Sequence, residues 1–476
     1  MSHPLFNSIL SDRVNQLSLE QTEINELVKY YNDITVFALD MCAPIKTHTI
    51  KKHNNYPCYS SSFYQMKKER RRLERRWRKA RNEHKLAALS VYKAQCRRLK
   101  IVQKQEFDLY CQNKFLLNRN NPQITTNFIK ELSGKTPSSP LPDEDNKLLL
   151  ANKYNDYFIE KIQTIRNSIT PYFNALECKH KYTDSSLREF KTLSDPDVIL
   201  LIARSKNKQC CLDPLPTELM KLHLDAYLPL VKEVLNRSLI TGKFPDNLKH
   251  ACIRPVLKNN KLDKNKLNSY RPVSNLPLLS IVIETAILDQ LNSHMTKDNL
   301  LDPNQSAYRQ GHSTETLLMH VSDIALRNLD NGKCTALLML DLSAAFDTLD
   351  HPILLHTLYH HFGVCSTALK WFQSFLSNRT QCVKIAESMS ETRTLSYGAP
   401  QGSVLAGPLF TIFMTPLQHV INMHSNVTYQ SYADDTQLII STTTRDQPDL
   451  DPLTKCIVDI RRFMNSYFLK LNEEKN

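Results

Sequence analysis

Residues 334–347 read Cys-Thr-Ala-Leu-Leu-Met-Leu-Asp-Leu-Ser-Ala-Ala-Phe-Asp, and this stretch decides the fold. Cys334 to Leu340 is a continuous apolar run of strand length that ends at Asp341. A helical pattern follows from Ile353 to Phe362. A carboxylate at the carboxyl end of a buried strand can stand at a cleft without being enclosed by the core. Asp341 is therefore the first candidate site residue.

A second acidic segment follows further along the chain. Val427 to Ile440 predicts two strands joined by a polar tip that carries Asp434 and Asp435. Adjacent carboxylates repel each other, so a fold gains little from the pair unless cations neutralise them. Mg²⁺ prefers carboxylate oxygen and leaves coordination sites for phosphate. Taken alone, Asp-Asp is also an ordinary turn signal, and that alternative stays open at this point.

The segment between these acids is rich in glycine. Gly398 to Gly407 holds three of the eight glycines of the chain within ten residues. Glycine is favoured where the backbone must approach another group closely. The pattern indicates a loop and helix start lying against a nucleotide and its template, and the alternative is a plain loop.

The rest of the chain supports an α+β domain from about residue 245 onward. Residues 251–257 predict another strand, and residues 147–168 and 231–239 have helical spacing, the latter closed by Gly242. Ser194 to Asp197 predicts a helix start with proline in the first turn. We expect a helical basic region at 1–132, a flexible linker at 133–146, a helical extension at 147–244 and the α+β domain at 245–476.

Composition excludes several classes of protein. Hydrophobic residues make up 41% and charged residues 23% of 476, which is typical of a globular protein. No uncharged apolar run is long enough to cross a bilayer, which takes roughly 20 residues. The twelve cysteines form no C-x-x-C pair, which predicts free thiols without a disulfide partner. We expect a location in the nucleus and cytoplasm, and the oligomeric state stays open.

The formal net charge of +13 is concentrated in one segment. Residues 64–119 hold 18 Lys or Arg against 5 Asp or Glu, so the remaining chain is neutral overall. Apolar residues from Leu73 to Ala94 recur at steps of three and four, which predicts one continuous helix. The expected nucleic-acid contacts on it are Arg70, Arg71, Arg72, Arg75, Arg76 and Arg78. The alternative is a solvated helix face.

Together these segments resemble reverse transcriptases. Asp341 to Asp347, Gly398 to Ser403 and Tyr432 to Asp435 look like motifs A, B and C, in the right order and spacing. Asn268 to Ser274 and Gln305 to Ser313 resemble fingers motifs, and Phe468 to Lys475 resembles the opening of motif D. The resemblance is to the LINE-type, non-LTR retrotransposon enzymes. It covers nearly the whole chain, since residues 211–216, 242–245 and the arginine-rich segment also fit that family.

The resemblance implies a right-hand polymerase with palm and fingers and a two-metal nucleotidyl transfer from dNTP to a DNA primer on an RNA template. It implies two Mg²⁺ ions, with Mn²⁺ as a substitute, on Asp341, Asp434, Asp435 and the Leu342 carbonyl. Lys475 corresponds to a lysine that protonates pyrophosphate. The nucleotide contacts that it implies are Lys258, Arg271, Phe346, Gln401 and Gly402. The template-side contacts that it implies are Arg309 and Gly398.

Some residues have competing explanations. Phe346 corresponds to a steric gate against the ribose 2′-hydroxyl, but an aromatic residue after a strand is equally expected in the core. Asp347 is predicted to cap the following helix. His356 and His360 lie four apart without an acidic partner, which favours surface or packing roles.

The chain also departs from the family pattern. Ala406 shifts the Gly-Pro pair of motif B by one residue. The chain begins after the expected endonuclease and stops inside motif D, so we expect truncation at both ends, a missing thumb and weak or absent activity. The alternatives are a nucleic-acid-binding remnant and a related group II intron maturase or telomerase.

Overall fold

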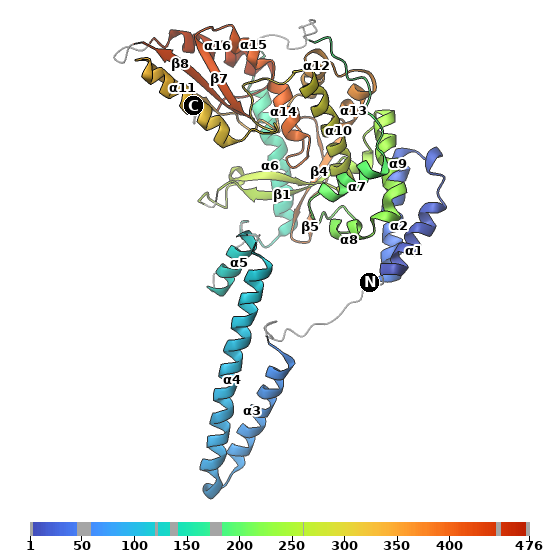
Figure 1. The fold of residues 1–476 in the computed structure, drawn as a ribbon, viewed down its shortest axis with the longest axis vertical. Helices are drawn as coiled ribbons and strands as arrows, with labels where there is room; N and C mark the ends of the chain where they lie inside the picture. Colours follow the sequence, from blue (N-terminus) through green and yellow to red (C-terminus); the bar gives the residue numbers. More distant parts are fainter. Residues whose placement is uncertain are drawn as a thin grey trace. The chain divides into compact units, whose positions relative to one another are not determined.

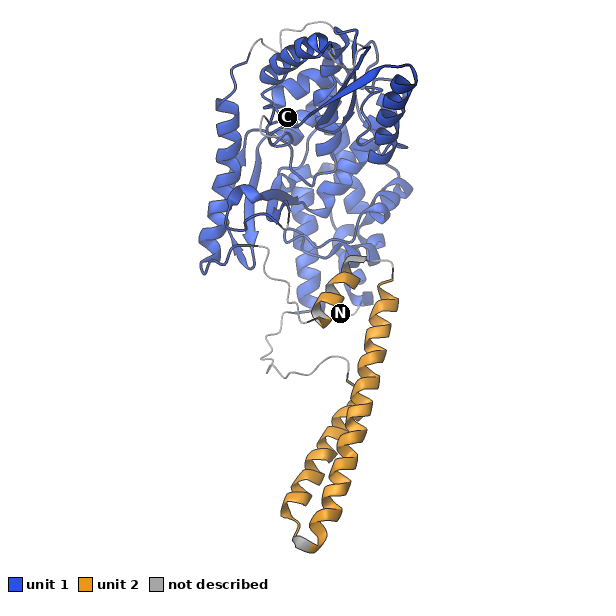
Figure 2. Ribbon diagram, turned by 90° about the vertical axis from the view of Figure 1, so that its left-hand side faces the viewer, with its two compact units in different colours: residues 1–45, 141–476 blue, residues 46–140 orange. Residues whose placement is uncertain are grey.

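The computed structural model describes residues 3–44, 59–119, 122–133, 141–171, 183–259, 261–443 and 449–472. It divides into two units (Figure 2). Unit 1 comprises residues 1–45 and 141–476, and unit 2 comprises residues 46–140. Among the described residues, no helix combines the length and hydropathy needed to span a membrane.

Unit 1 mixes helices with short strands (Figure 1). Its helices are α1 (His3–Asn15), α2 (Ile24–Cys42), α6 (Lys147–Asn167), α7 (Asp195–Arg204), α8 (Thr217–Leu222), α9 (Leu224–Thr241), α10 (Leu278–Lys297), α11 (Thr314–Asp330), α12 (His351–His360), α13 (Ser366–Leu376), α14 (Ala406–Met414), α15 (Leu417–Asn422) and α16 (Asp451–Ser466). Its strands are β1 (His250–Leu257), β2 (Tyr270–Asn275), β3 (Cys334–Leu340), β4 (Arg379–Ile385), β5 (Ser388–Met389), β6 (Arg393–Leu395), β7 (Val427–Tyr432) and β8 (Asp435–Thr442). The predicted α+β class is confirmed.

Two sheets frame the site. One has the order β3-β8-β7, with antiparallel pairs throughout. The other has the path β2-β1-β4-β5, with β6 also on β4, and its β1–β4 pair is parallel. The register of the first sheet places Leu340 opposite Thr436 and Tyr432 opposite Asp435. The end of β3 therefore lies beside the turn between β7 and β8.

The core of unit 1 joins segments that are far apart in the sequence. Trp371, Phe372 and Phe375 of α13 are fully buried, and Trp371 and Phe375 pack edge-on against Phe244. A separate cluster forms where Tyr154 and its neighbours on α6 cover the sheet of β1, β2 and β4. In Figure 1, α6 lies against this sheet. This packing fixes α6 on the sheet of β1, β2 and β4.

The first two helices belong to this same core. Phe6 and Leu10 of α1 and Val28 and Tyr31 of α2 are buried in the cluster that includes α9. The predicted region 1–132 put these helices with the basic segment, whereas the contacts of the structure group residues 1–45 with unit 1. The reason is tertiary: their apolar faces pack on a helix some two hundred residues later, and local sequence does not reveal that partner.

Unit 2 is built from α3 (Ser61–Lys79), α4 (Asn82–Leu117) and α5 (Pro122–Leu132). The predicted single helix from Leu73 to Ala94 is wrong, because the backbone turns at Ala80 and Arg81, which both have extended conformations. Trp77 stacks on Tyr92 with ring centroids 5.6 Å apart, so the two helices form a hairpin. The basic cluster consequently extends to the carboxyl end of α3, where the cations of its last turn interact favourably with the negative end of the helix dipole.

Half of the predicted linker at 133–146 lies outside the described residues, since 134–140 are not described. Elsewhere several predicted boundaries are confirmed. The predicted helix at 147–168 is α6, the start at Ser194 is the capping box of α7, and Gly242 ends α9 with a left-handed φ of 66°.

Candidate active site

Two carboxylates from different strands meet at one end of the β3-β8-β7 sheet. Asp341 directly follows β3, and Asp434 lies in the two-residue turn between β7 and β8. Burial raises the pKa of Asp434, and the negative charges of Asp435 and Asp341 raise it further, while the Arg271 guanidinium opposes them. The two carboxylates are thus close enough to repel each other, which favours a cation between them.

Both carboxylates line a large cleft of about 1420 Å³. Its walls come from α6, the β1–β2 connection, the segment after β3, the start of α14 and the residues following α16. The predicted site residues that line it are Lys258, Arg271, Asp341, Leu342, Phe346, Gln401, Gly402 and Asp434. The structure therefore brings together residues that are up to 176 positions apart in the sequence.

One wall of the cleft is basic. Arg271 comes from β2, and its charge acts on Asp434. Lys258 follows β1, and its Nζ donates a hydrogen bond to the carbonyl of Asn268 at 2.8 Å. Lys161 of α6 lines the same cleft, and both lysines lower the pKa of the nearby Asp347. Cations opposite a carboxylate pair suit a ligand that carries several phosphate groups.

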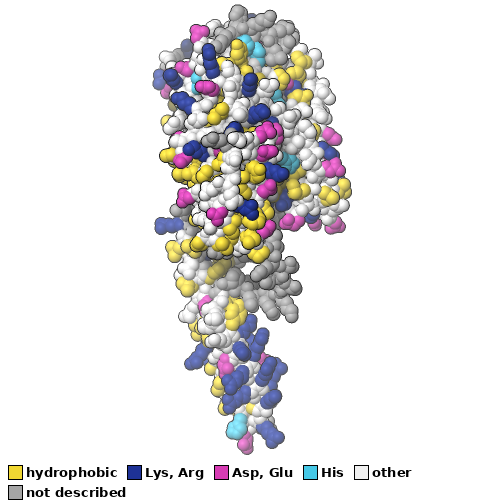
Figure 3. Space-filling model, turned by 90° about the vertical axis from the view of Figure 1, so that its right-hand side faces the viewer, with side chains coloured by type: hydrophobic (Ala, Val, Ile, Leu, Met, Phe, Trp, Pro, Cys, Tyr) yellow, Lys and Arg dark blue, Asp and Glu magenta, His cyan; other side chains and the backbone are white. Residues whose placement is uncertain are grey.

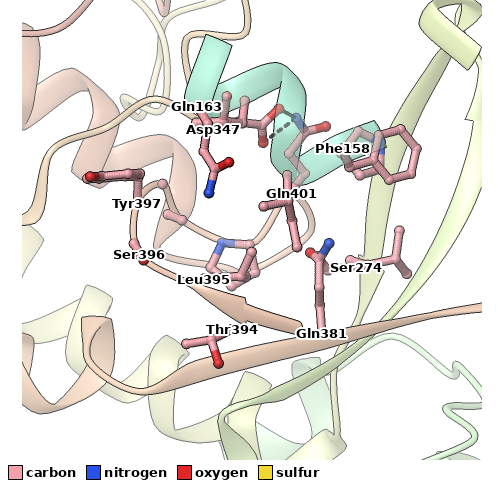
Figure 4. Close-up of a pocket in the computed structure, with 17 residues that line it drawn as sticks. Phe158, Gln163, Ser274, Asp347, Gln381, Thr394, Leu395, Ser396, Tyr397 and Gln401 are labelled. Atoms are coloured by element: carbon pink, nitrogen blue, oxygen red, sulfur yellow. Dashed lines mark hydrogen bonds between the residues drawn. The ribbon is translucent and has the colours of Figure 1, made fainter. Parts of the chain in front are cut away.

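Asp347 holds the glycine-rich loop. The Nε2 of Gln401 lies 2.8 Å and 2.9 Å from the two carboxylate oxygens of Asp347 (Figure 4). Burial raises the pKa of Asp347 to about 6, against the opposing effect of this hydrogen bonding. The predicted helix cap at Asp347 is wrong, because the side chain of Asp350 caps α12 by accepting from the Ile353 amide at 3.1 Å.

The loop glycines lie where a side chain has no room. A Cβ on Gly398 would come within 2.7 Å of the Asp347 carbonyl oxygen, and one on Gly402 within 2.6 Å of the Ser274 carbonyl oxygen. Both glycines also have positive φ angles, 78° and 121°. The close approach to backbone explains both positions, and it fixes the loop between β2 and the segment after β3.

A buried glutamate anchors the helix that follows the loop. Glu284 is fully buried on α10, and its carboxylate accepts from the Ser403 hydroxyl and from the amides of Val404 and Leu405. These amides precede α14, so the glutamate satisfies groups that the helix start leaves unpaired. The shifted glycine, Gly407, lies under the ring of Tyr308, whose Cζ is 2.2 Å from where a Cβ would stand.

A smaller pocket of about 80 Å³ shares Asp347, Gln401 and Pro272 with the cleft. Figure 4 shows Phe158 of α6, Gln381 of β4 and Tyr397 around it. Gly398 lines this pocket and is not among the residues lining the cleft.

Other predicted residues lie outside the cleft. Asp435 is exposed at the start of β8. The Nη1 of Arg309 donates to the Asp302 carbonyl at 3.3 Å. Phe346, by contrast, lines the cleft, and its ring packs on Phe410 with ring centroids 4.8 Å apart. Its role as a steric gate stays a prediction. Lys475 lies outside the described residues.

Within the described ranges, no group of three or more His, Cys, Asp and Glu is arranged as a metal cluster. The acidic residues that line the cleft are Glu160, Asp341, Asp347 and Asp434, of which Asp341 and Asp434 interact with each other. His356 and His360 contact each other as rings 4.1 Å apart on α12.

Several site residues were not predicted. Asn472 donates from its side chain to Asp341 at 2.7 Å and from its backbone to the Asp341 carbonyl at 2.9 Å. Lys161, Tyr308 and Glu284 were also missed. A signal existed for Asn472 and Tyr308, since both lie inside segments that the sequence had already singled out.

The predicted arginines lie on unit 2. Figure 3 shows Lys and Arg side chains gathered on its helices. Arg72 pairs with Glu69 at 3.5 Å and Arg78 pairs with Glu74 at 2.7 Å. Arg71, Arg75 and Arg76 are exposed and have no ion pair within the described residues. The cluster thus keeps a net positive face that its own acids do not neutralise.

The part of the chain that forms most of this cleft matches a known protein family. Residues 258–476 match the family described as reverse transcriptase (RNA-dependent DNA polymerase). The match begins at Lys258 and includes the cleft residues of the β1–β2 connection, both acidic segments and the glycine-rich loop.

Curated relatives are similar over more of the chain. The RNA-directed DNA polymerase from mobile element jockey of Drosophila melanogaster is 25% identical over 469 residues, covering 92% of this chain and 49% of the relative. The probable RNA-directed DNA polymerase from transposon BS of the same organism is 28% identical, covering 52% of this chain and 27% of the relative. The jockey polymerase of Drosophila funebris is 30% identical, covering 48% and 25%. The chain spans between a quarter and a half of these relatives.

Proposed function

We propose that this chain, which carries a reverse transcriptase domain of the LINE type over residues 258–476, is the RNA-directed DNA polymerase part of a mobile-element protein. It would transfer the nucleotidyl group of a dNTP to the 3′-hydroxyl of a DNA primer on an RNA template, with pyrophosphate as the leaving group. Residues 245–476 would form the palm and fingers, with the helical regions before them. The nucleus and cytoplasm are the proposed locations.

One observation carries this proposal. Asp341 and Asp434 meet at the end of one sheet, and Arg271 from the other sheet faces them across the same cleft. Phosphoryl transfer needs little covalent chemistry from a protein, and depends on positioning and on neutralising charge. An acidic pair opposite a basic wall is suited to both tasks.

The donor set fits divalent cations. Asp341 and Asp434 offer carboxylate oxygens whose mutual repulsion a cation would relieve, and Leu342, whose carbonyl would be a further ligand, lines the same cleft. We assign Mg²⁺ to these ligands, with Mn²⁺ able to replace it and with Asp435 beside them. When bound, such ions lower the pKa of the primer hydroxyl and neutralise the leaving pyrophosphate.

The other residues of the chain would bind and orient the substrates. Arg271 and Lys258 would contact the triphosphate, for which arginine's planar fork is well suited. Phe346, held by Phe410, would lie under the ribose. Gln401, fixed by Asp347, and Gly402 would line the nucleotide side. Gly398 and Arg309 would face the template, and Lys475 would protonate pyrophosphate.

Primer extension on an RNA template with Mg²⁺ tests the proposal. Asp434→Asn and Asp341→Asn are each expected to lower extension at least ~10³-fold, because each removes charge that the transition state needs. Asp323→Asn is the matched control, since Asp323 is an exposed aspartate on α11 that pairs with Arg327 of the same helix. Extension that persists in both site variants would sink the assignment.

We further propose that the basic hairpin of unit 2 binds nucleic acid through Arg70, Arg71, Arg72, Arg75, Arg76 and Arg78. Its support is the concentration of charge on α3 and the scarcity of acids around it. Replacing Arg71, Arg72, Arg75, Arg76 and Arg78 by Gln should flatten the plot of log affinity against log salt by about 4, at roughly 0.7 to 0.9 per phosphate contact. The control replaces the exposed Lys29, Lys191 and Lys297 of unit 1. An unchanged slope would remove the hairpin from the interface.

A further inference from the structure

The turn that carries Asp434 is held by a side chain from a distant segment. The Nε2 of Gln305 donates to the carbonyl of Ala433 at 3.2 Å, and the Ala433 amide donates to the Oε1 of Gln305 at 2.9 Å. Both backbone polar groups of the residue before Asp434 are therefore bound by one amide. This pairing is specific, because only a primary amide of this length offers a donor and an acceptor side by side.

Ala433 adopts a conformation that it would not keep without support. Its φ is 57°, in the left-handed region that disfavours residues with a Cβ. It occupies the first position of a two-residue hairpin turn, where glycine is preferred when φ is positive. Ala433 is also buried, at 7% exposure, so water does not satisfy its backbone groups.

Gln305 is itself fixed to the sheet. Its segment, Asp302–Ala307, runs parallel to β7, with the Ser431 amide donating to the Asn304 carbonyl at 2.8 Å and the Ser306 amide donating to the Ser431 carbonyl at 2.9 Å. The Tyr429 hydroxyl donates to Asp302 at 2.8 Å. The Gln305 oxygen also accepts from the Ala307 amide at 3.0 Å. The backbone on either side of Gln305 is thus bound to β7, and its side-chain oxygen is bound to the Ala307 amide.

We propose that Gln305 is a positioning residue, which fixes the left-handed turn at Ala433 and so keeps the carboxylate of Asp434 beside Asp341. The proposal rests on the proposed function, because it concerns the same acidic pair. Repulsion between the two carboxylates pushes the turn away from β3 when no cation lies between them. The two hydrogen bonds between Gln305 and Ala433 resist that displacement, so the carboxylates are already in position when a cation binds.

The first test measures Mn²⁺ binding to the full chain without substrates, by electron paramagnetic resonance. Gln305→Ala is expected to raise the Mn²⁺ dissociation constant at least tenfold. Gln305→Glu keeps the shape and the acceptor but loses the donor to Ala433, so a smaller increase is expected. Gln310→Ala, an exposed glutamine of the same loop, is the matched control and should match wild type.

A second measurement separates positioning from general stability. Ala433→Gly removes the cost of the left-handed conformation, so Gln305→Ala should lose severalfold less Mn²⁺ affinity in that background than alone. Hydrogen exchange of residues 427–442 should accelerate at the turn in Gln305→Ala while the strands keep their protection. In primer extension the expected pattern is a kcat lowered about 10²-fold with a KM for dNTP changed less than threefold.

The outcomes distinguish the two proposals. Unchanged Mn²⁺ affinity and unchanged exchange in Gln305→Ala would overturn the role of Gln305, whatever the activity. Equal losses with and without the Ala433→Gly substitution would also overturn it, because the effect would then not pass through the turn. A wild-type chain that binds Mn²⁺ but never extends a primer would instead contradict the proposed function, and the exchange result would still decide the role of Gln305.

Discussion

At the residue scale, Gly407 lies where a side chain has no room. The ring of Tyr308 lies where a Cβ at residue 407 would stand, and Tyr308 has a left-handed φ of 57°. Gly407→Ala should therefore displace the ring from the cleft and lower primer extension about tenfold or more. In a Tyr308→Ala background the same substitution should have little further effect, and steady-state kinetics of the four variants measure the coupling. Additive losses would show that the contact is unimportant.

A buried carboxylate gives a pH prediction. Burial raises the pKa of Asp213 from 3.8 to about 7, while its hydrogen bonds from the Leu278 amide oppose the shift. The pKa of Asp213 is higher in the folded state than in the unfolded state, so between pH 3.8 and 7 the folded state binds more protons. This extra proton binding stabilises the folded state, and the stabilisation is lost as pH rises through that window. Asp213→Asn should therefore gain stability relative to wild type as pH rises from about 4 to about 8.

Urea unfolding of both proteins across that range measures the difference. A difference in unfolding free energy that is flat with pH would contradict the raised pKa of Asp213.

Site residues could be predicted from the sequence where a pattern in the neighbouring residues indicated them. Asp341, Asp434 and the loop glycines lie at strand ends and in a glycine cluster, so composition and spacing indicated them. Glu284 had no such signal, because the amides from which it accepts lie more than a hundred residues away. Its importance comes from contacts across the fold, which a single sequence does not display.

At the element scale, one arginine joins α6 to the segment before α12. The Arg166 guanidinium lies 3.7 Å from the ring centroid of Tyr397 and 4.1 Å from that of Phe468, and it pairs with the mostly buried Asp350 at 2.7 Å. Arg166→Ala leaves that carboxylate without its cation, and should cost about 3–5 kcal/mol in unfolding free energy.

Denaturant unfolding checks this against Lys153→Ala. Lys153 lies on the same helix, but its ion pair with Glu144 is exposed, so its loss should cost under about 1 kcal/mol. Equal effects for the two variants would contradict the special role of Arg166.

Elements were predictable where periodicity and capping agreed. Apolar runs gave β3 and the β7–β8 hairpin, and capping residues gave the start of α7 and the end of α9. The turn between α3 and α4 was missed because no proline or glycine interrupts the helical pattern. The stacking of Trp77 on Tyr92 belongs to the folded hairpin, and it overrides local propensity.

At the scale of the whole molecule, α1 belongs to the core of unit 1 despite its distance in sequence. Phe6 is fully buried and its ring lies 4.7 Å from that of His223. Phe6→Ala should cost about 3–5 kcal/mol in unfolding free energy, as for other large-to-small core substitutions. Leu5→Ala is the control, since Leu5 is 50% exposed and should change stability little. A negligible effect of Phe6→Ala would separate α1 from the core.

The discontinuity of unit 1 has a consequence for synthesis. Residues 3–44 leave the ribosome long before α9, the helix on which α1 and α2 pack. At about 5–20 residues per second, the roughly 180 intervening residues take about 10–40 s to translate. During that interval α1 and α2 can pack on each other, but the apolar faces that pack on α9 lack that partner. We expect this early segment to depend on nascent-chain chaperones, while the hairpin of unit 2, whose contacts are local, folds as it emerges.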